Sequence, residues 1–384
     1  MLGAQNLGLQ PPAGKVAGGT GLDELNDIIV TSSGHVVGIG SSRFKDNRVR
    51  QGWWLSWDTK DELVEIQLGE AAMYTGYDAL LTIADEGYLA VGTEFISDEQ
   101  QYDGLVVSID KTGNILWSKH FGGVRWDWLK AIVPDGSGGY FLTGWTDSFG
   151  SGDSDIFLLN IDHEGRELYQ RTFGGFDNEW ANEALVLSNG TLVVAGATAT
   201  YSIGGDDIWI LGLDQAGAII WQRTLGGYLD EEAQSMVAVN DSEFVVLAAV
   251  AADRTNKQHL ILIGFSNSGQ VLWTSTLKST GGLLATDLLV LPGNQLVVVG
   301  TSLSEASENS DLLLLGTDQR GQEIWRKTYG GPATDMGMAG VVDTDGVIYV
   351  AGKTYSYGSG DGDLWLFTTD VEGNSLNQVI IQGD

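Results

Sequence analysis

Short apolar runs separated by turns rich in glycine and aspartate dominate the pattern along this chain. Between residues 183 and 225 they read EALVLS, TLVVAGAT, DIWILGLD and IIWQRTL. Runs of this length, bounded by turn residues, are typical of β-strands, and nearly all-apolar runs indicate sheets packed on both faces. The segment therefore predicts four short antiparallel strands.

This four-strand unit recurs with a period of 52 residues. One series places a small residue in every copy, at Gly40, Gly92, Gly144, Gly196, Ala248, Gly300 and Gly352. The decamers SFGSGDSDIF and SYGSGDGDLW, which begin at Ser148 and Ser356, are copies three and seven of the same loop. Seven four-strand units without helical periodicity predict an all-β fold, a seven-bladed β-propeller.

The propeller is predicted to fill residues 20–384 as a single domain, after an N-terminal extension over residues 1–19. The last copy ends on LNQVIIQ, which supplies its own outer strand. The segment LQPPAG near the N-terminus is a poor strand because proline cannot donate to a β-ladder. We therefore expect no exchange of strands between the termini.

Two resemblances follow from the repeat pattern. The order (F/L/Y)GG, (A/T)GxT, SD(I/L) and DxxG resembles propeller domains of secreted or surface-attached bacterial proteins, which implies an extracellular or cell-surface location. DxxG followed by tryptophan, as in the segment that ends at Trp117, is similar to the repeat of pyrroloquinoline-quinone dehydrogenases. The chain departs from that family in having seven copies, no vicinal cysteines and no DxxTG, so the quinone cofactor is not expected.

The net charge limits the classes of partner that the protein is expected to bind. The chain carries 20 basic and 51 acidic residues, a net charge of −31, and no cysteine. Such a field repels nucleic acid and anionic membranes and favours basic partners or cations, so we expect neither a nucleic-acid nor a membrane partner. Disulfides and cysteine-ligated zinc are excluded. The first residues lack the basic and apolar regions of a signal peptide.

Strand order separates two ends of each blade. The short DxxG turns share one end, whereas the SFGSGD-type loops and the blade-to-blade connections share the other, which we call the loop face. Because function usually resides in variable loops on a rigid scaffold, residues that break the repeat are the candidates there. Recurrent residues such as Asp155 are interpreted as scaffold. Calcium at Asp153, Asp155, Asp361 and Asp363 is a minor alternative, and no other cofactor or metal is expected.

Tryptophans break the repeat in copies three and four. Trp126, Trp128 and Trp180 lie in connections, and Trp145 follows the repeated glycine of copy three. Two interpretations stay open: the rings contact a ligand, or they pack between blades. Carboxylates at one connection position form a second candidate set, namely Asp23, Asp127, Glu179, Glu231 and Asp335. A solvated structural role is the alternative for these side chains.

A basic loop in copy one is the third candidate, with Arg43, Lys45, Arg48 and Arg50 in an otherwise acidic chain. The four histidines fall on different strands, so no catalytic set is predicted. The sequence thus favours a non-enzymatic propeller that binds a protein or peptide partner on its loop face, with a basic partner favoured by the charge. The alternatives are a glycan-binding propeller that uses the tryptophans and, less favoured, a hydrolase or cofactor enzyme.

Overall fold

The computed structural model describes residues 15–16, 23–31, 34–43, 50–58, 63–68, 74–83, 87–97, 101–251, 258–304, 309–358 and 362–382. The chain divides into two compact units, Tyr77–Ser275 and Met1–Gly76 with Thr276–Asp384. Each unit is described by itself. Within the described ranges we find no helix of the length and apolarity needed to cross a membrane.

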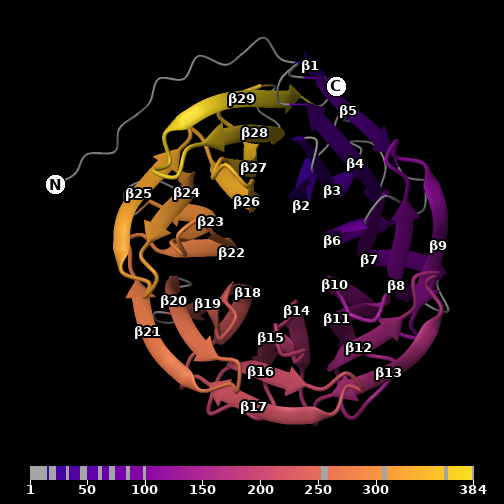
Figure 1. Cartoon of the computed structure of the whole chain (residues 1–384). Helices are drawn as coiled ribbons and strands as arrows, with labels where there is room; N and C mark the ends of the chain where they lie inside the picture. Colours follow the sequence, from indigo (N-terminus) through magenta and orange to yellow (C-terminus); the bar gives the residue numbers. More distant parts are fainter. Residues whose placement is uncertain are drawn as a thin grey trace. The chain divides into compact units, whose positions relative to one another are not determined.

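The Tyr77–Ser275 unit contains blades two to five, apart from a few residues at either end (Figure 1). Each blade is a four-stranded antiparallel sheet whose strands follow one another in sequence. The strands are β6 (Thr75–Ile83), β7 (Gly87–Ser97), β8 (Gln101–Ile109) and β9 (Ile115–Phe121); β10 (Asp127–Pro134), β11 (Tyr140–Thr146), β12 (Asp155–Ile161) and β13 (Glu167–Phe173); β14 (Glu179–Val186), β15 (Leu192–Thr198), β16 (Asp207–Leu213) and β17 (Ile219–Leu225); β18 (Glu231–Asn240), β19 (Glu243–Ala251), β20 (Gln258–Ser266) and β21 (Val271–Leu277).

The other unit contains blades one, six and seven. Their strands are β2 (Asp23–Val30), β3 (His35–Arg43), β4 (Arg50–Asp58) and β5 (Leu63–Leu68); β22 (Leu283–Val290), β23 (Leu296–Leu303), β24 (Ser310–Thr317) and β25 (Glu323–Tyr329); β26 (Asp335–Val342), β27 (Ile348–Thr354), β28 (Asp363–Thr369) and β29 (Ser375–Gln382). The seven sheets confirm the predicted all-β, seven-bladed β-propeller.

The last blade supplies its own outer strand, as LNQVIIQ predicts, because β29 pairs antiparallel with β28. The short strand β1 (Lys15–Val16) then adds to β29 in parallel, with Lys15 opposite Ile381. The N-terminal segment therefore extends a blade that already has four strands, and it does not replace one of them.

A β-bulge in the first strand explains the glycine that recurs every 52 residues. In blade three the register between β10 and β11 shifts between Leu129 and Ala131, just after the pair Leu129 and Gly144. A Cβ atom on Gly144 would lie 1.9 Å from the carbonyl oxygen of Trp128. The same contact recurs at Gly40 and Gly196, so close backbone approach rather than turn geometry explains the glycine in these copies, whereas copy five accommodates Ala248 beside the same bulge.

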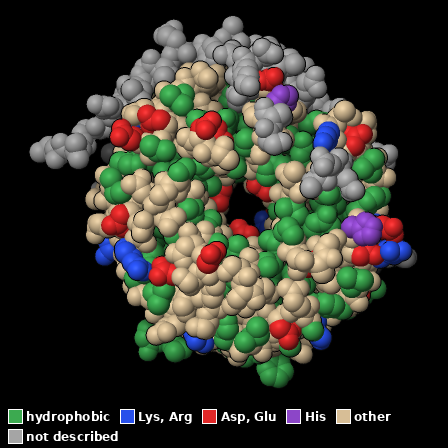
Figure 2. Space-filling model, in the orientation of Figure 1, with side chains coloured by type: hydrophobic (Ala, Val, Ile, Leu, Met, Phe, Trp, Pro, Cys, Tyr) green, Lys and Arg blue, Asp and Glu red, His purple; other side chains and the backbone are tan. Residues whose placement is uncertain are grey.

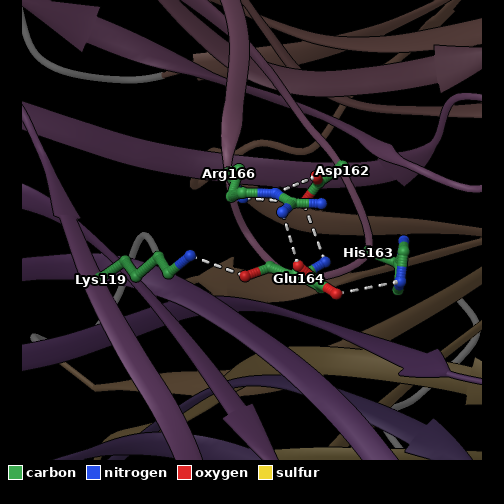
Figure 3. A network of polar contacts seen from close by, with 5 residues as sticks. All are labelled: Lys119, Asp162, His163, Glu164 and Arg166. Carbon is green, nitrogen blue, oxygen red and sulfur yellow. Dashed lines mark hydrogen bonds and ion pairs between the residues drawn. The ribbon is translucent and has the colours of Figure 1, made fainter.

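Within each unit, the described turns of the DxxG type contact the outer strand of the preceding blade. In blade three Asp162 Oδ1 accepts hydrogen bonds from the backbone N–H groups of Glu164 and Arg166, at 2.9 Å each. Lys119 of blade two donates to the carbonyl oxygen of Glu164 at 2.7 Å, and Arg166 pairs with Asp162 (Figure 3). Gly165 (φ +72) lies against the ring of Trp117 from blade two. The turn aspartates and outer tryptophans are thus scaffold, as predicted.

Apolar cores lie between adjacent blades. In the Tyr77–Ser275 unit, one core joins Phe141 and Leu158 of blade three to Val194 and Trp209 of blade four. All seven residues of β12 are buried, and so are all seven of β16, which accounts for their nearly continuous apolar sequences. This packing fixes the ends of the strands from which the loop face extends.

Candidate functional site

The loop face of the Tyr77–Ser275 unit is built from loops that hold one another. Its parts are the connections 122–126, 174–178 and 226–230 and the second-to-third-strand loops 147–154 and 199–206. Ser154 donates its backbone N–H to Asn178 Oδ1 at 3.2 Å, and Asp177 donates to Thr200 Oγ1 at 3.0 Å. The backbone N–H of Asp206 donates to Asp230 Oδ1 at 3.2 Å. These bonds join segments of blades three, four and five into a continuous surface.

Large apolar side chains stand exposed at one repeated position of this surface. Val124, Phe176 and Tyr228 each follow a Gly-Gly pair, and they are 70%, 87% and 86% exposed. Tyr201 and Ile203 of loop 199–206 are exposed as well. The equivalent residues of other copies are small or polar: Thr20, Ala72, Thr280 and Pro332. We call Val124, Phe176, Tyr201, Ile203 and Tyr228 the apolar row.

Sequence reasoning missed the apolar row, although the repeat carried the signal. The position after Gly-Gly is apolar and large only in three consecutive connections, those that enter blades three, four and five. Large apolar side chains exposed on one face of a folded domain are candidates for an interaction site.

Exposed carboxylates lie in the same loops as the apolar row. Asp153, Asp177 and Asp230 are exposed in the same loops, and Arg125 is an exposed cation among them. Figure 2 shows acidic and hydrophobic side chains interspersed on one face of the molecule. An apolar surface with acidic neighbours is complementary to a partner that offers apolar and basic groups.

The four predicted tryptophans occupy different environments. Trp126 is 49% exposed and meets Tyr102 edge to face, with ring centroids 5.4 Å apart. Trp128 and Trp145, which are opposite each other in the β10–β11 pairing, stack with centroids 5.2 Å apart. The structure thus brings Trp128 and Trp145 together. Trp126 instead packs against Tyr102, and about half of its surface is exposed to solvent.

Carboxylates of neighbouring blades fix two of the indoles. Trp128 Nε1 donates to Asp78 Oδ2 of blade two at 2.7 Å, and Lys130 also binds Asp78, at 2.6 Å. Trp180 Nε1 donates to Glu232 Oε1 of blade five at 2.5 Å. Trp128 and Trp180 are therefore each half-buried and linked to a different neighbouring blade. Asp78 and Glu232 were not singled out from the sequence.

The predicted carboxylates of the connections are buried and support the loops. Asp127 and Glu179 are each 0% exposed. Asp127 accepts from the Gly123 N–H at 2.8 Å and from Ser148 Oγ at 2.7 Å. Glu179 accepts from the Gly175 N–H at 2.7 Å and from Thr198 Oγ1 at 2.8 Å. Burial raises the pKa of Asp127, although its hydrogen bonds oppose the rise.

The remaining connection carboxylates follow the same geometry where they are described. Glu231 accepts from the Gly227 N–H at 2.9 Å. In the other unit, Asp335 accepts from the Gly331 N–H at 2.9 Å and from Ser356 Oγ at 2.5 Å. The side chain of Asp23 lies outside the described residues. These carboxylates hold the Gly-Gly connections in place, a role that their shared hydrogen-bond pattern explains.

Glu94, Asp103 and His120 form a titratable cluster in blade two that was not predicted from the sequence. His120 Nε2 lies 2.5 Å from Glu94 Oε2, and this hydrogen bond is the main cause that raises the pKa of His120. Most other copies carry threonine or serine at the Glu94 and His120 positions. Asp103 lies nearby, and burial followed by the charge of Asp127 raises its pKa to about 6, while His120 opposes the rise.

The residues of the minor calcium alternative do not converge where they are described. Asp153 is exposed, whereas Asp155 is buried and accepts the Ser151 N–H at 2.6 Å. Asp363 is buried, and Asp361 lies outside the described residues. Within the described ranges, we find no group of three or more His, Asp or Glu side chains placed to hold a metal ion.

The predicted basic loop lies largely outside the described residues. Lys45 and Arg48 belong to residues 44–49, and the side chains of Arg43 and Arg50 are likewise not described. Its role as a contact for an acidic partner stays a prediction.

Comparison with known proteins identifies the fold. No protein-family model matches the chain, and no curated protein matches its sequence. Among solved structures, the WD40 domain of Neurospora crassa Pan2 aligns with a TM-score of 0.51 at 11% identity, covering 85% of this chain and 86% of that one. The β-propeller domain of the trilobed protease from Pyrococcus furiosus gives 0.50 at 12% identity, covering 91% and 95%.

A hydrolase with a longer chain is also similar. Puromycin hydrolase aligns with a TM-score of 0.59 at 14% identity over 96% of this chain, which covers 56% of that protein. At these identities the likeness concerns architecture alone, and it extends to proteins of unrelated function. Together with the seven four-stranded blades, it identifies this chain as a seven-bladed β-propeller.

Proposed function

We propose that this propeller is a non-enzymatic interaction module that binds a protein or peptide partner on the loop face of its Tyr77–Ser275 unit. The observation that carries the proposal is the apolar row, in which Phe176 and Tyr228 are 87% and 86% exposed. Burying such side chains contributes about 1.5–3 kcal/mol each, so a partner that covers the row gains substantial free energy.

The charges around the row favour a basic partner. Asp153, Asp177 and Asp230 border the exposed side chains, and the whole chain carries a net charge of −31. A lysine or arginine side chain of the partner pairs with these carboxylates and also packs on the faces of Tyr201 or Tyr228. The resemblance of the repeats to bacterial surface propellers agrees with an interaction role.

In this proposal, one residue predicted from the sequence contacts the partner, and the others hold the loops and strands in place. Trp126, with half its surface exposed, contacts the partner at the edge of the row. Asp127, Glu179 and Glu231 hold the connections that present Val124, Phe176 and Tyr228. Trp128, Trp145 and Trp180 stiffen the adjoining first and second strands.

Glycan binding is the alternative that the exposed Trp126 ring favours, because an indole face stacks on a sugar ring. Because Trp128 and Trp145 stack on each other, fewer indole faces are free to bind a sugar ring. Salt distinguishes the two: binding of a basic peptide weakens as ionic strength rises, whereas stacking on a neutral sugar barely responds.

The test is selection of peptides from a random display library on the purified protein. We expect the enriched peptides to combine lysine or arginine with apolar residues, and their affinity to fall at least tenfold in the Phe176→Ala/Tyr228→Ala double variant. Such a loss is typical when two central interface side chains are truncated.

The matched control is Leu168→Ala/Ile220→Ala, which removes two exposed apolar side chains from the outer strands β13 and β17. This variant should bind the selected peptides like the wild type. Equal binding to wild type and to the Phe176→Ala/Tyr228→Ala variant would rule the apolar row out as the binding surface.

A further inference from the structure

Carboxyl groups occur in pairs where one blade meets the next. The first member begins the third strand of a blade, and the second begins the first strand of the following blade, 24 residues later. Four junctions carry a carboxyl group at both positions: Asp103 with Asp127, Asp155 with Glu179, Asp207 with Glu231, and Asp311 with Asp335. Two junctions carry one at neither position: Gln51 with Thr75, and His259 with Leu283. The two positions thus change together.

A glycine keeps each pair together. A Cβ atom on Gly174 would lie 1.7 Å from Asp155 Oδ1 and 2.5 Å from Glu179 Oε2. On Gly226 it would lie 2.2 Å from Asp207 Oδ1 and 2.6 Å from Glu231 Oε2. Gly122 and Gly330 have the same position at the other two junctions. Both carboxyl groups of a pair therefore contact the first glycine of the Gly-Gly connection.

An oxygen without a partner remains in three of the four pairs. Asp103 Oδ1, Asp207 Oδ1 and Asp335 Oδ1 are buried and accept no hydrogen bond, and their side chains belong to residues that are 8%, 2% and 0% exposed. Two ionised carboxylates in contact inside a protein repel each other strongly, and a buried acceptor without a donor adds a desolvation cost.

We propose that each of these four carboxyl pairs binds one proton at mildly acidic pH, which the two carboxyl groups share in an O–H···O⁻ hydrogen bond. In the Asp103–Asp127 and Asp207–Glu231 pairs, the free oxygen lies beside the shared glycine, and the proton supplies the donor that this oxygen lacks. In all four pairs the proton removes one of the two negative charges. A lone carboxyl group gains neither benefit, which accounts for the joint change to neutral residues at two junctions.

A proton fits the pairs better than a metal ion does. Calcium takes six to eight oxygen ligands, whereas each pair offers only two carboxyl groups, and several of their oxygens already accept hydrogen bonds from backbone N–H and hydroxyl donors. The glycine contact also leaves little space between the two groups.

Other charged groups near the pairs do not neutralise them, with one exception. Asp147 faces Asp127, Asp230 faces Glu231, and Asp206 lies near both Glu179 and Asp207. Tyr357 lies near Asp311 and Asp335. The exception is His120, which faces Asp103 and is itself bound to Glu94. Among the residues that the structure describes, the titratable neighbours named for three of the four pairs are thus acidic or neutral.

The pKa directions agree with proton binding. Burial, followed by the charge of the partner, raises the pKa of Asp103 to about 6 and raises the pKa of Asp311. Burial is also the main cause that raises the pKa of Asp155 and of Glu231. One member of every pair is therefore displaced toward the protonated form.

The test counts protons released on unfolding. The wild-type protein is unfolded with guanidinium chloride in weakly buffered solution at pH 5.5, and the released protons are titrated. Because the unfolded chain ionises both members of each pair, we expect release, and one proton fewer in Asp207→Asn. The amide of that variant donates a fixed hydrogen bond to Glu231, so the fold is retained. Asp311→Asn, measured separately, should also release one proton fewer than the wild type.

Asp153→Asn is the matched control, since it makes the same chemical change at an exposed, unpaired carboxylate of the loop face. Its proton release should equal that of the wild type. Infrared spectra of the folded wild type at pH 5.5 should also contain a protonated-carboxyl band, so the test does not depend on any variant folding. Absence of that band, or wild-type proton release from both paired variants, overturns the proposal. A rise in melting temperature with calcium that Asp207→Asn abolishes overturns it in favour of a cation.

Discussion

The repeated glycine is the clearest case of a single residue type that this fold constrains. Replacing Gly144 with alanine places a methyl group 1.9 Å from the carbonyl oxygen of Trp128, so the bulge or the strand must shift. Overpacking of this kind costs about 1–3 kcal/mol. We expect Gly144→Ala to lower the free energy of unfolding by that amount, measured by denaturant titration.

Gly227→Ala is the control for this substitution, because its Cβ would meet only Glu231 Oε1, at 3.9 Å. It should change the free energy of unfolding by less than about 0.5 kcal/mol, as is usual for substitutions away from packed contacts. A Gly144→Ala variant as stable as Gly227→Ala would mean that the bulge adapts without cost.

Residue-level prediction from the sequence succeeded where the repeat supplied several copies. The small residue at Gly144 and the turn aspartate Asp162 could be predicted because each recurs with the same neighbours. The apolar row was missed because attention to tryptophan outweighed Phe176 and Tyr228, whose exposure depends on how the loops lie. The contact between Glu94 and His120 was missed because it joins residues of different strands, and sequence separation hides such pairs.

At the scale of elements, the outer strand of one blade is held by the turn of the next. The ring of Trp221 in β17 lies against Gly269 in the DxxG-type turn of blade five and stacks near Phe244, with centroids 6.4 Å apart. Trp221→Ala removes this contact between blades four and five. We expect a loss of about 2–4 kcal/mol in the free energy of unfolding, somewhat below a fully buried tryptophan.

Ile220→Ala tests whether the effect belongs to the blade contact. Ile220 precedes Trp221 in the same strand and is 57% exposed, so its truncation should cost less than about 0.5 kcal/mol. Limited proteolysis of the two variants should differ in the same sense, with new cleavage between blades four and five only in Trp221→Ala. Similar losses in both variants would assign the effect to strand propensity.

At the scale of the whole molecule, the fold class was open to prediction because seven copies average out the ambiguity of any one strand. The Gly-Gly connections and the DxxG turns supplied the strand order. The extension of the last blade by β1 was not predicted, because the two residues Lys15 and Val16 carry no pattern that distinguishes a strand from a linker. Which loops carry the interaction surface depended on exposure, which periodicity does not encode.

The acidity of the whole molecule should make its stability rise on mild acidification. Asp103, with a pKa raised to about 6, binds a proton more tightly in the folded protein than in the unfolded chain, where 3.8 is usual. Stability therefore increases as the pH falls from above 6 toward 3.8. The raised pKa of His120 acts in the same direction. Reduced repulsion as the net charge of −31 shrinks toward the pI near 4.2 adds to the gain.

The opposite sign sets in at lower pH. Hydrogen bonds from Arg166 lower the pKa of Asp162 to about 2, so the folded state loses stability as the pH falls from 3.8 toward 2. We expect the melting temperature, followed by circular dichroism at constant ionic strength, to reach its maximum between pH 4 and 6. Asp103→Asn should rise less on acidification than the wild type, because it carries no titratable proton at that position. A melting temperature that falls steadily from pH 8 to pH 5 would show that the buried carboxyl groups are ionised in the folded protein.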